Sequence, residues 1–321
     1  MSFDTPILLM VFNRPDTTRQ VLDAVRKVKP KFLFVAADGP RADKPGEAER
    51  CQEVRDVFKT IDWDCKLRTL YRGQNLGCGH GPANAISWFF SNVEQGIILE
   101  DDCVPDESFF SYCAELLHRY KGNEQVMHIS GNNFLAKKFT DKESYYFTKY
   151  FTAWGWATWR RAWQHYDFNV KFVDAFLNSD KFDKLALNSK QSEYWKKIAE
   201  MVKDGKRGDI WDYQWMLTCW NNNGYAIIPV VNLVTNIGFG ADATHTVDDS
   251  WTAYVKTGTI DSIVHPASIV RNTEVDKKTF DAYFEPPQHL NKARGIMYKI
   301  FPNSVMRQVQ KLRRKLFPDL K

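Results

Sequence analysis

Short apolar runs alternate with amphipathic stretches over residues 1–130. The runs are rich in Ile, Leu, Val and Phe and are bounded by turn residues, which is typical of buried strands, at 6–12, 32–36, 97–100 and 126–130. Residues 66–71 alternate like a further strand. Between the strands, apolar residues recur at helical spacing, near 16–28, 46–60, 82–92 and 106–120. This alternation predicts an α/β fold with a mostly parallel central sheet flanked by helices.

The pattern is less regular after residue 130. An aromatic segment comes first, and helical, strand-like and glycine-rich segments follow it, at 145–163, 171–178, 190–204, 226–231 and 236–245. Neither an internal repeat nor a low-complexity linker divides the chain. We therefore expect one domain over 1–285, with a regular half at about 1–130 and a less regular half at about 131–285, and then a tail at 286–321.

The basic charge of the chain is concentrated in that tail. The net charge is +5, and residues 291–321 hold nine Lys or Arg against one acid, Asp319. Apolar residues recur among these charges between Ala293 and Leu316, with Pro302 as an interruption, which predicts two short basic amphipathic helices. Such helices either contact an anionic membrane or dock on their own domain, and both interpretations stay open. The basic charge is confined to the tail. Aromatic residues do not alternate with the basic ones there in the way expected of proteins that bind RNA or single-stranded nucleic acid, so nucleic-acid binding is not expected.

The cysteines and the hydropathy of the chain indicate the cellular compartment that the sequence predicts. The six cysteines form no CxxC pair, and no His lies at metal-ligand spacing from them, so we interpret them as reduced thiols. The N-terminus lacks a charged segment followed by a long apolar one, and no apolar run approaches about 18 residues, so the sequence predicts neither a signal peptide nor a transmembrane helix. A cytoplasmic protein is expected, peripheral at the inner face of the membrane if the tail binds lipid.

The strongest chemical signal is the acidic triplet Glu100-Asp101-Asp102 at the end of the apolar run 97–99. In open α/β sheets, ligands bind at the carboxyl ends of strands. Adjacent carboxylates repel one another unless a cation lies between them, and hard cations such as Mn²⁺ or Mg²⁺ use a few carboxylates together with substrate phosphates. The triplet therefore predicts a metal and a phosphorylated ligand, whereas the alternative is a solvated acidic turn.

Three further features follow predicted strands. Arg14, after the first strand, could bind phosphate or cap a carboxylate, or it could be a surface residue. Asp38, after the second strand, could accept hydrogen bonds from a nucleobase or ribose, or belong to a plain turn. The glycine-rich turn 77–81 precedes a helix and could meet an anion, although a merely tight turn is the favoured interpretation.

A second acidic site is predicted at Asp212, beside Trp211. A carboxylate next to Trp is partly desolvated, which raises its basicity toward that of a general base. The alternative is a helix start with Asp as its cap and Trp in the core. His245 could ligate metal or contact phosphate, or be structural.

Taken in order, these motifs resemble the GT-A glycosyltransferases, and within them N-acetylglucosaminyltransferase I and its bacterial relatives. The likeness covers roughly residues 5–250. Four segments carry it, namely Phe12-Asn13-Arg14-Pro15, Ile98 to Asp102 with Pro105-Asp106 and Phe109-Phe110, Ala153-Trp154-Gly155-Trp156, and Trp211-Asp212 with Trp215-Met216, Ile228-Pro229 and Gly238 to His245. The resemblance implies a Rossmann-like donor half at about 1–130 and an acceptor half at about 131–285.

The resemblance also implies roles for individual residues. Arg14, Asp38, Glu100 and Asp101 would bind the donor. Asp102 would hold Mn²⁺ (or Mg²⁺) with the donor diphosphate. Asp212 would be the general base of an inverting transfer. Trp154, Trp211 and His245 are further candidates.

The implied function is metal-dependent transfer of a hexose or N-acetylhexosamine from a nucleotide-diphosphate sugar to a hydroxyl acceptor. The first expected donor is a UDP-sugar. The expected acceptor is a saccharide or glycolipid in surface glycan synthesis. Ala85 stands about where the eukaryotic enzyme has a donor-contacting His, so the donor base and sugar stay open. A sugar-nucleotide pyrophosphorylase is an alternative, but it would need a glycine-rich basic loop after the first strand. A non-catalytic saccharide- or membrane-binding protein is the other alternative.

Overall fold

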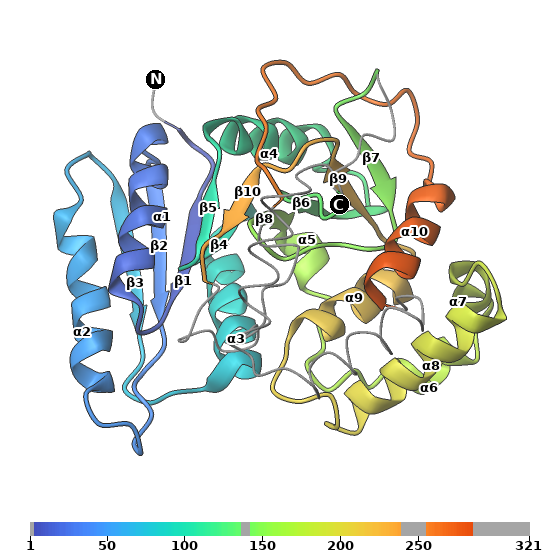
Figure 1. Ribbon diagram of the computed structural model, residues 1–321, viewed down its shortest axis with the longest axis horizontal. Coiled ribbons are helices and arrows are strands. Elements are labelled where there is room, and N and C mark those ends of the chain that lie inside the picture. The colour runs from blue at the N-terminus through green and yellow to red at the C-terminus, as the bar shows by residue number, and fades with distance from the viewer. Residues whose placement is uncertain (1–2, 136–141, 239–254, 285–321) are drawn as a thin grey trace, which may run out of the picture. The chain divides into compact units, whose positions relative to one another are not determined.

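A computed structural model describes residues 3–135, 142–238 and 255–284 (Figure 1). By its internal contacts the chain divides into two compact units, 1–276 and 277–321, and the second is described only over 277–284. The sheet and the candidate site belong to the first unit. The predicted tail at 286–321 lies outside the described residues.

Strands and helices alternate along the first unit. The strands are β1 Ile7–Val11, β2 Phe32–Ala37, β3 Lys66–Tyr71, β4 Gln95–Glu100, β5 Cys103–Pro105, β6 Val126–Ser130, β7 Tyr145–Thr148, β8 Trp156–Trp159, β9 Tyr225–Pro229 and β10 Val234–Asn236. The helices are α1 Pro15–Val28, α2 Glu47–Val57, α3 Gly77–Asn92, α4 Glu107–Arg119, α5 Arg160–Trp163, α6 Val173–Leu177, α7 Asp180–Leu185, α8 Ser189–Lys203, α9 Asp212–Asn221 and α10 Thr273–Thr279, and the last one reaches into the second unit. Short 3₁₀ and π turns occupy Phe58–Thr60 and Phe280–Phe284.

The described strands form one eight-stranded sheet in the order β3-β2-β1-β4-β8-β6-β9-β7. Neighbours run parallel from β3 to β4 and again between β6 and β9. Strand β8 is antiparallel to both β4 and β6, and β7 is antiparallel to β9. Strands β5 and β10 pair in a separate small antiparallel sheet. The predicted α/β fold with a mostly parallel central sheet is confirmed.

Helices cover both faces of the sheet because alternate strand residues point to opposite sides. Leu9 and Leu99 pack in a cluster with residues of α1, α2 and α4. Leu8 and Ile98 pack in a second cluster with residues of α3, α5 and α9. Figure 1 shows α1 and α2 next to each other along the first three strands. Among the described residues, no helix is both long enough and apolar enough to cross a membrane.

The structure departs from the sequence-based expectation in detail. The aromatic segment 145–163 contains the two strands β7 and β8, which pattern reading did not assign. Residues 77–81 are not a turn before a helix but the first turn of α3 itself. Strands β7 and β8 are four residues long and lie in a segment dense in aromatic residues, so neither has a separate apolar run bounded by turn residues that would have identified it.

Candidate active site

The acidic triplet lies where the order of strands in the sheet reverses. Strand β1 has β2 on one side and β4 on the other, and Met10 of β1 is level with Glu100 of β4. Strands β1 and β4 therefore end at the same level of the sheet. Phe12 to Arg14 follow β1 there, and Asp101 and Asp102 follow β4. Such a switch point forms a crevice outside the carboxyl ends of parallel strands, which is the common ligand position in this class of sheet.

Arg14 binds two carboxylates of the triplet at once. Its guanidinium forms ion pairs with Asp101 and, at 3.0 Å between Nη1 and Oδ2, with Asp102. Asp101 also accepts a hydrogen bond from the backbone N–H of Phe12, at 3.2 Å. Asp101 is only 3% exposed, so its carboxylate holds Arg14 and the β1 turn in place. The structure thus brings together three of the predicted residues, and the donor contact of Asp101 stays a prediction.

Among the carboxyl groups of the triplet, the pKa of Glu100 is strongly perturbed by its neighbours. Burial and the charges of Asp102 and Asp101 raise the pKa of Glu100 to about 8, although Arg14 acts in the opposite direction. Burial also raises the pKa of Asp101, against the pull of Arg14. One guanidinium therefore does not neutralise the cluster, and its negative potential suits a further cation.

The side chains of the cluster fit an oxygen-coordinated divalent metal ion. Glu100, Asp102 and Cys103 offer ligand atoms within 4.8 Å of one another. Burial and the neighbouring carboxylates hold the pKa of the Cys103 thiol well above its usual range, and this thiol donates to Asp102 Oδ1 at 3.4 Å. Mn²⁺ and Mg²⁺ prefer oxygen ligands to sulfur, which leaves the carboxylates of Glu100 and Asp102 as the donors for such an ion.

Strand β10 brings a later part of the chain against Asp102. Its pairing with β5 puts Asn236 opposite Cys103, and the N–H of Ile237 donates to the Asp102 carbonyl at 2.8 Å. A methyl group on Gly238 would lie 2.1 Å from Asp102 Oδ2, so a larger residue there would displace the Asp102 carboxylate. The predicted closing loop begins at this glycine, and its remainder, with His245, lies outside the described residues.

Asp212 is the first residue of α9, and the fold brings it toward the acidic triplet. Its negative charge is among the charges that raise the pKa of Glu100, after burial, Asp102 and Asp101. Its Oδ1 accepts from the N–H of Tyr213 at 2.9 Å. The two acidic sites, about 110 residues apart in the sequence, therefore lie within electrostatic range of each other.

Trp211 and Trp154 are placed differently from each other. Trp211 is 6% exposed and stacks on Trp156 at 5.6 Å, and its carbonyl accepts from the Tyr166 hydroxyl at 3.1 Å. Trp154 is half-buried and meets Phe134 edge to face at 4.7 Å between ring centroids. Trp211 is thus part of the support behind Asp212, whereas part of Trp154 is open to solvent.

Asp38 is bound to the loop before α3. Its carboxylate accepts from the N–H of Leu76 at 3.0 Å and from the N–H of Gly39 at 3.0 Å. Burial raises its pKa despite these hydrogen bonds. In the described structure Asp38 fixes the route of the chain into α3, and its contact with a nucleotide stays a prediction.

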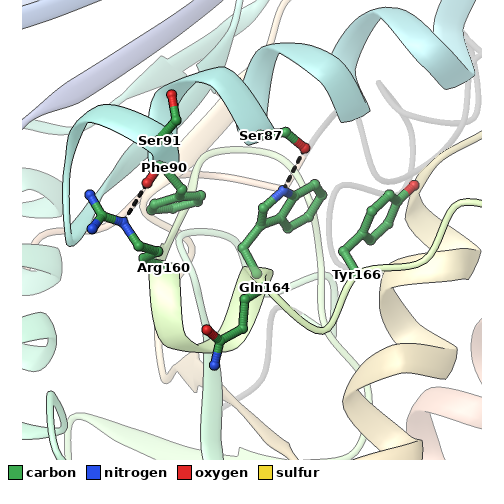
Figure 2. A pocket seen from close by; sticks show the side chains of 7 residues that line it. Ser87, Phe90, Ser91, Arg160, Gln164 and Tyr166 are labelled. Atoms are coloured by element: carbon green, nitrogen blue, oxygen red, sulfur yellow. Dashed lines mark hydrogen bonds between the residues drawn. The ribbon is translucent and has the colours of Figure 1, made fainter.

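A separate cavity of about 270 Å³ lies between α3 and α5 (Figure 2). Trp163 Nε1 donates to Ser87 Oγ at 3.0 Å across it, and Arg160 donates to the Phe90 carbonyl. The Trp163 and Phe90 side chains are at most 4% exposed, so they offer little free ring surface to a ligand. The cavity is lined by none of the predicted site residues.

Sequence reasoning missed several residues that build the site. Glu47 of α2 accepts from Asn13 Nδ2 at 2.9 Å and pairs with Arg41, which fixes the turn before Arg14. Cys103 and Asp209 were also missed. An acid and an amide 34 residues apart have no local pattern that could have identified their contact.

Comparison with known proteins gave distant structural matches only. No family model and no curated protein sequence matches the chain. Among solved structures, S. aureus TarS (residues 1–349) is similar at 10% identity and a TM-score of 0.33, over 61% of this chain and 56% of that one. A cytidylyltransferase from Leptospira borgpetersenii is similar at 9% identity and a TM-score of 0.32, over 66% and 75%. A 4-diphosphocytidyl-2C-methyl-D-erythritol synthase from Anaerococcus prevotii is similar at 10% identity and a TM-score of 0.30, over 60% and 84%.

Proposed function

We propose that the protein is a metal-dependent inverting glycosyltransferase that moves a sugar from a nucleotide-diphosphate donor to a hydroxyl acceptor. The observation that carries this proposal is the acidic triplet at the switch point of the sheet, with Asp212 close enough for its charge to raise the pKa of Glu100. A cation-binding carboxylate pair and a separate carboxylate base are the groups that such a transfer requires.

The residues of the triplet and Arg14 would bind different parts of the donor site. Asp102 and Glu100 would hold Mn²⁺ or Mg²⁺, which when bound neutralises charge on the leaving diphosphate. Arg14, fixed by Asp101, would face the phosphates from the β1 side of the crevice. A UDP-sugar is the donor we would test first.

Asp212 would act on the acceptor. Its carboxylate takes the proton of the acceptor hydroxyl while that oxygen forms a bond to C1 of the donor sugar. The bond from C1 to the diphosphate oxygen breaks on the opposite face, and the nucleoside diphosphate leaves with the electron pair. A single displacement needs one base and no covalent intermediate, unlike the paired carboxylates of a retaining glycosidase.

A thermal-shift panel of UDP-, GDP-, CDP- and TDP-sugars with and without Mn²⁺ tests donor binding first. A donor that binds the folded state raises the melting temperature by mass action. Release of the nucleoside diphosphate from that donor in the presence of saccharide acceptors then tests transfer. Release of pyrophosphate, or formation of nucleotide sugar from NTP and sugar phosphate, would instead identify a pyrophosphorylase. Binding without turnover would identify a binding protein.

Two variants separate the proposed roles. Asp212→Asn should lower turnover about 10²- to 10⁴-fold and leave the affinity for UDP with Mn²⁺ unchanged. Asp102→Asn should weaken the Mn²⁺-dependent binding of UDP. Asp204→Asn is a matched control, since Asp204 is an exposed acid that pairs with Lys206. Near-normal turnover in Asp212→Asn would refute the assignment of the base.

A further inference from the structure

The N-terminus of helix α3 is occupied by a carboxylate of the chain itself. Asp209 Oδ1 accepts a hydrogen bond from the N–H of Gly79 at 2.8 Å, across 130 residues of sequence. The first-turn N–H groups of a helix lack partners within the helix and carry partial positive charge, so a carboxylate there is favourable. The contact joins the half of the chain that holds the acidic triplet to the segment that precedes Asp212.

The glycines of this turn make room for Asp209. A methyl group on Gly79 would lie 2.4 Å from Asp209 Oδ1, and one on Gly77 would lie 2.1 Å from Oδ2. Gly77 also has φ of +77°, a conformation that other residues rarely adopt. The glycine-rich sequence, for which an anion contact was the less favoured interpretation, therefore has the Asp209 carboxyl group against it in the structure.

The segment from Asp209 to Asp212 is fastened along its length. The Ile210 carbonyl accepts from Gln214 Nε2 at 2.9 Å, and the Trp211 carbonyl accepts from the Tyr166 hydroxyl at 3.1 Å. Asp212 comes next and begins α9. A shift of the Asp209 contact would therefore be passed on to Asp212 over three residues of bonded chain.

The first turn of α3 lies close to both acidic groups. Burial raises the pKa of Cys78, and the charges of Asp209 and Glu100 raise it further. Cys78 stands between Gly77 and Gly79, so this turn contacts Asp209 and lies within electrostatic range of the triplet.

From this geometry we infer that Asp209 is a positioning residue, whose bond to the start of α3 sets the place of Asp212 relative to the acidic triplet. The catalytic part of this inference rests on the proposed function. Asp209 itself does not touch donor or acceptor in this account. It holds the proposed base at a fixed position relative to the proposed donor site.

Kinetic analysis of Asp209→Ala and Asp209→Asn tests the positioning role. Asp209→Ala should lower kcat about 10- to 100-fold, because a displacement of about 1 Å costs a reaction this much. The affinity for UDP with Mn²⁺ should stay within about twofold, since the triplet is intact. Asn keeps the Oδ1 acceptor, so Asp209→Asn should recover most of kcat. Asp204→Asn again serves as the exposed control.

A second route breaks the same contact from the other side. Gly79→Ala, at a helical position where alanine normally stabilises, should here lower both melting temperature and kcat. In the Asp209→Ala background the same change should cost less of both, because the Asp209 oxygen at 2.4 Å has gone and the Ile210 backbone, at 3.0 and 3.2 Å, is the contact that remains. Additive effects of the two substitutions would overturn the inference.

Hydrogen exchange separates this inference from the proposed function. In Asp209→Ala the amide of Gly79 should lose protection, whether or not a sugar donor has been found. If wild type turns over no nucleotide sugar but this loss is observed, the proposed function fails and the contact stands. If wild type is active and Asp209→Ala keeps full kcat, or loses kcat and Mn²⁺–UDP affinity together, the positioning role is refuted.

Discussion

His128, in the middle of strand β6, should make the protein acid-sensitive. Its ring is fully buried, stacked 4.7 Å from Trp156, and its Nδ1 accepts from Trp215 Nε1 at 3.2 Å. Its Nε2 donates to the Thr152 carbonyl at 3.1 Å, so both ring nitrogens are used by the neutral form. Protonation would add a proton at Nδ1 and break the bond to Trp215, which lies on the same helix as Asp212.

The size of the effect follows from the pKa. Burial lowers the pKa of His128 to about 3 from its ordinary 6.5. Between these values the unfolded chain binds one more proton than the folded one, so each unit of falling pH costs about 1.4 kcal/mol of unfolding free energy. At pH 5, which is 1.5 units below the ordinary pKa, the loss is about 2 kcal/mol.

Urea unfolding of wild type and His128→Gln at pH 7.5, 6 and 5 measures this loss. Glutamine keeps an acceptor and a donor but does not titrate, and the acids common to both proteins cancel in the difference. The variant should be the less stable of the two at pH 7.5, and the gap should narrow by about 2 kcal/mol at pH 5. A gap that stays constant with pH would refute the reasoning.

Two further predictions concern buried charges. Burial lowers the pKa of Lys149 to about 7 from 10.5, so the unfolded chain binds more protons than the folded chain between these values. The unfolding free energy should therefore rise with pH from 7 to 10.5 in wild type but not in Lys149→Met. Denaturant titrations of both proteins at pH 7.5 and 9.5 measure this, and an equal rise in the two would contradict it. Arg14→Met leaves the buried carboxylate of Asp101 unpaired and should cost about 3–5 kcal/mol of unfolding free energy, partly recovered by adding Asp101→Asn. Arg19→Met removes only an exposed ion pair and should cost less than about 1 kcal/mol, so a similar loss in both arginine variants would argue against a special role for Arg14.

Local pattern was enough to predict the strands that deliver the site. The run 97–99 ends in three acids, and both the strand and its exposed carboxyl end follow from apolar residues meeting charged ones. The strands β7 and β8 were missed because each has four residues and lies inside a continuous aromatic segment, without turn residues that set it apart as a run of its own. The contact of Asp209 with Gly79 could not be predicted, because it depends on which distant segments the fold brings together.

The pairing of Arg14 with Asp101 shows the same division. Each residue was recognised as a candidate from its place after a strand, but their mutual ion pair requires β1 and β4 to be neighbours in the sheet. Strand order is a property of the whole chain. For this reason the sequence predicted the residues of the site better than it predicted their contacts.

The insertion of β8 between β4 and β6 has a consequence for how the protein is made. Strands β1 to β4 are complete once residue 100 has left the ribosome, but the free edge of β4, with Ile97 and Ile98, is covered only by β8 at residues 156–159. Until then a nascent chain exposes an apolar strand edge that other chains can pair with. Because β6 pairs with β8 and β9, and β7 pairs with β9, a chain that stops before Trp156 would hold the sheet β3-β2-β1-β4 and leave β6 and β7 unpaired, so early termination should yield aggregates rather than a smaller folded domain.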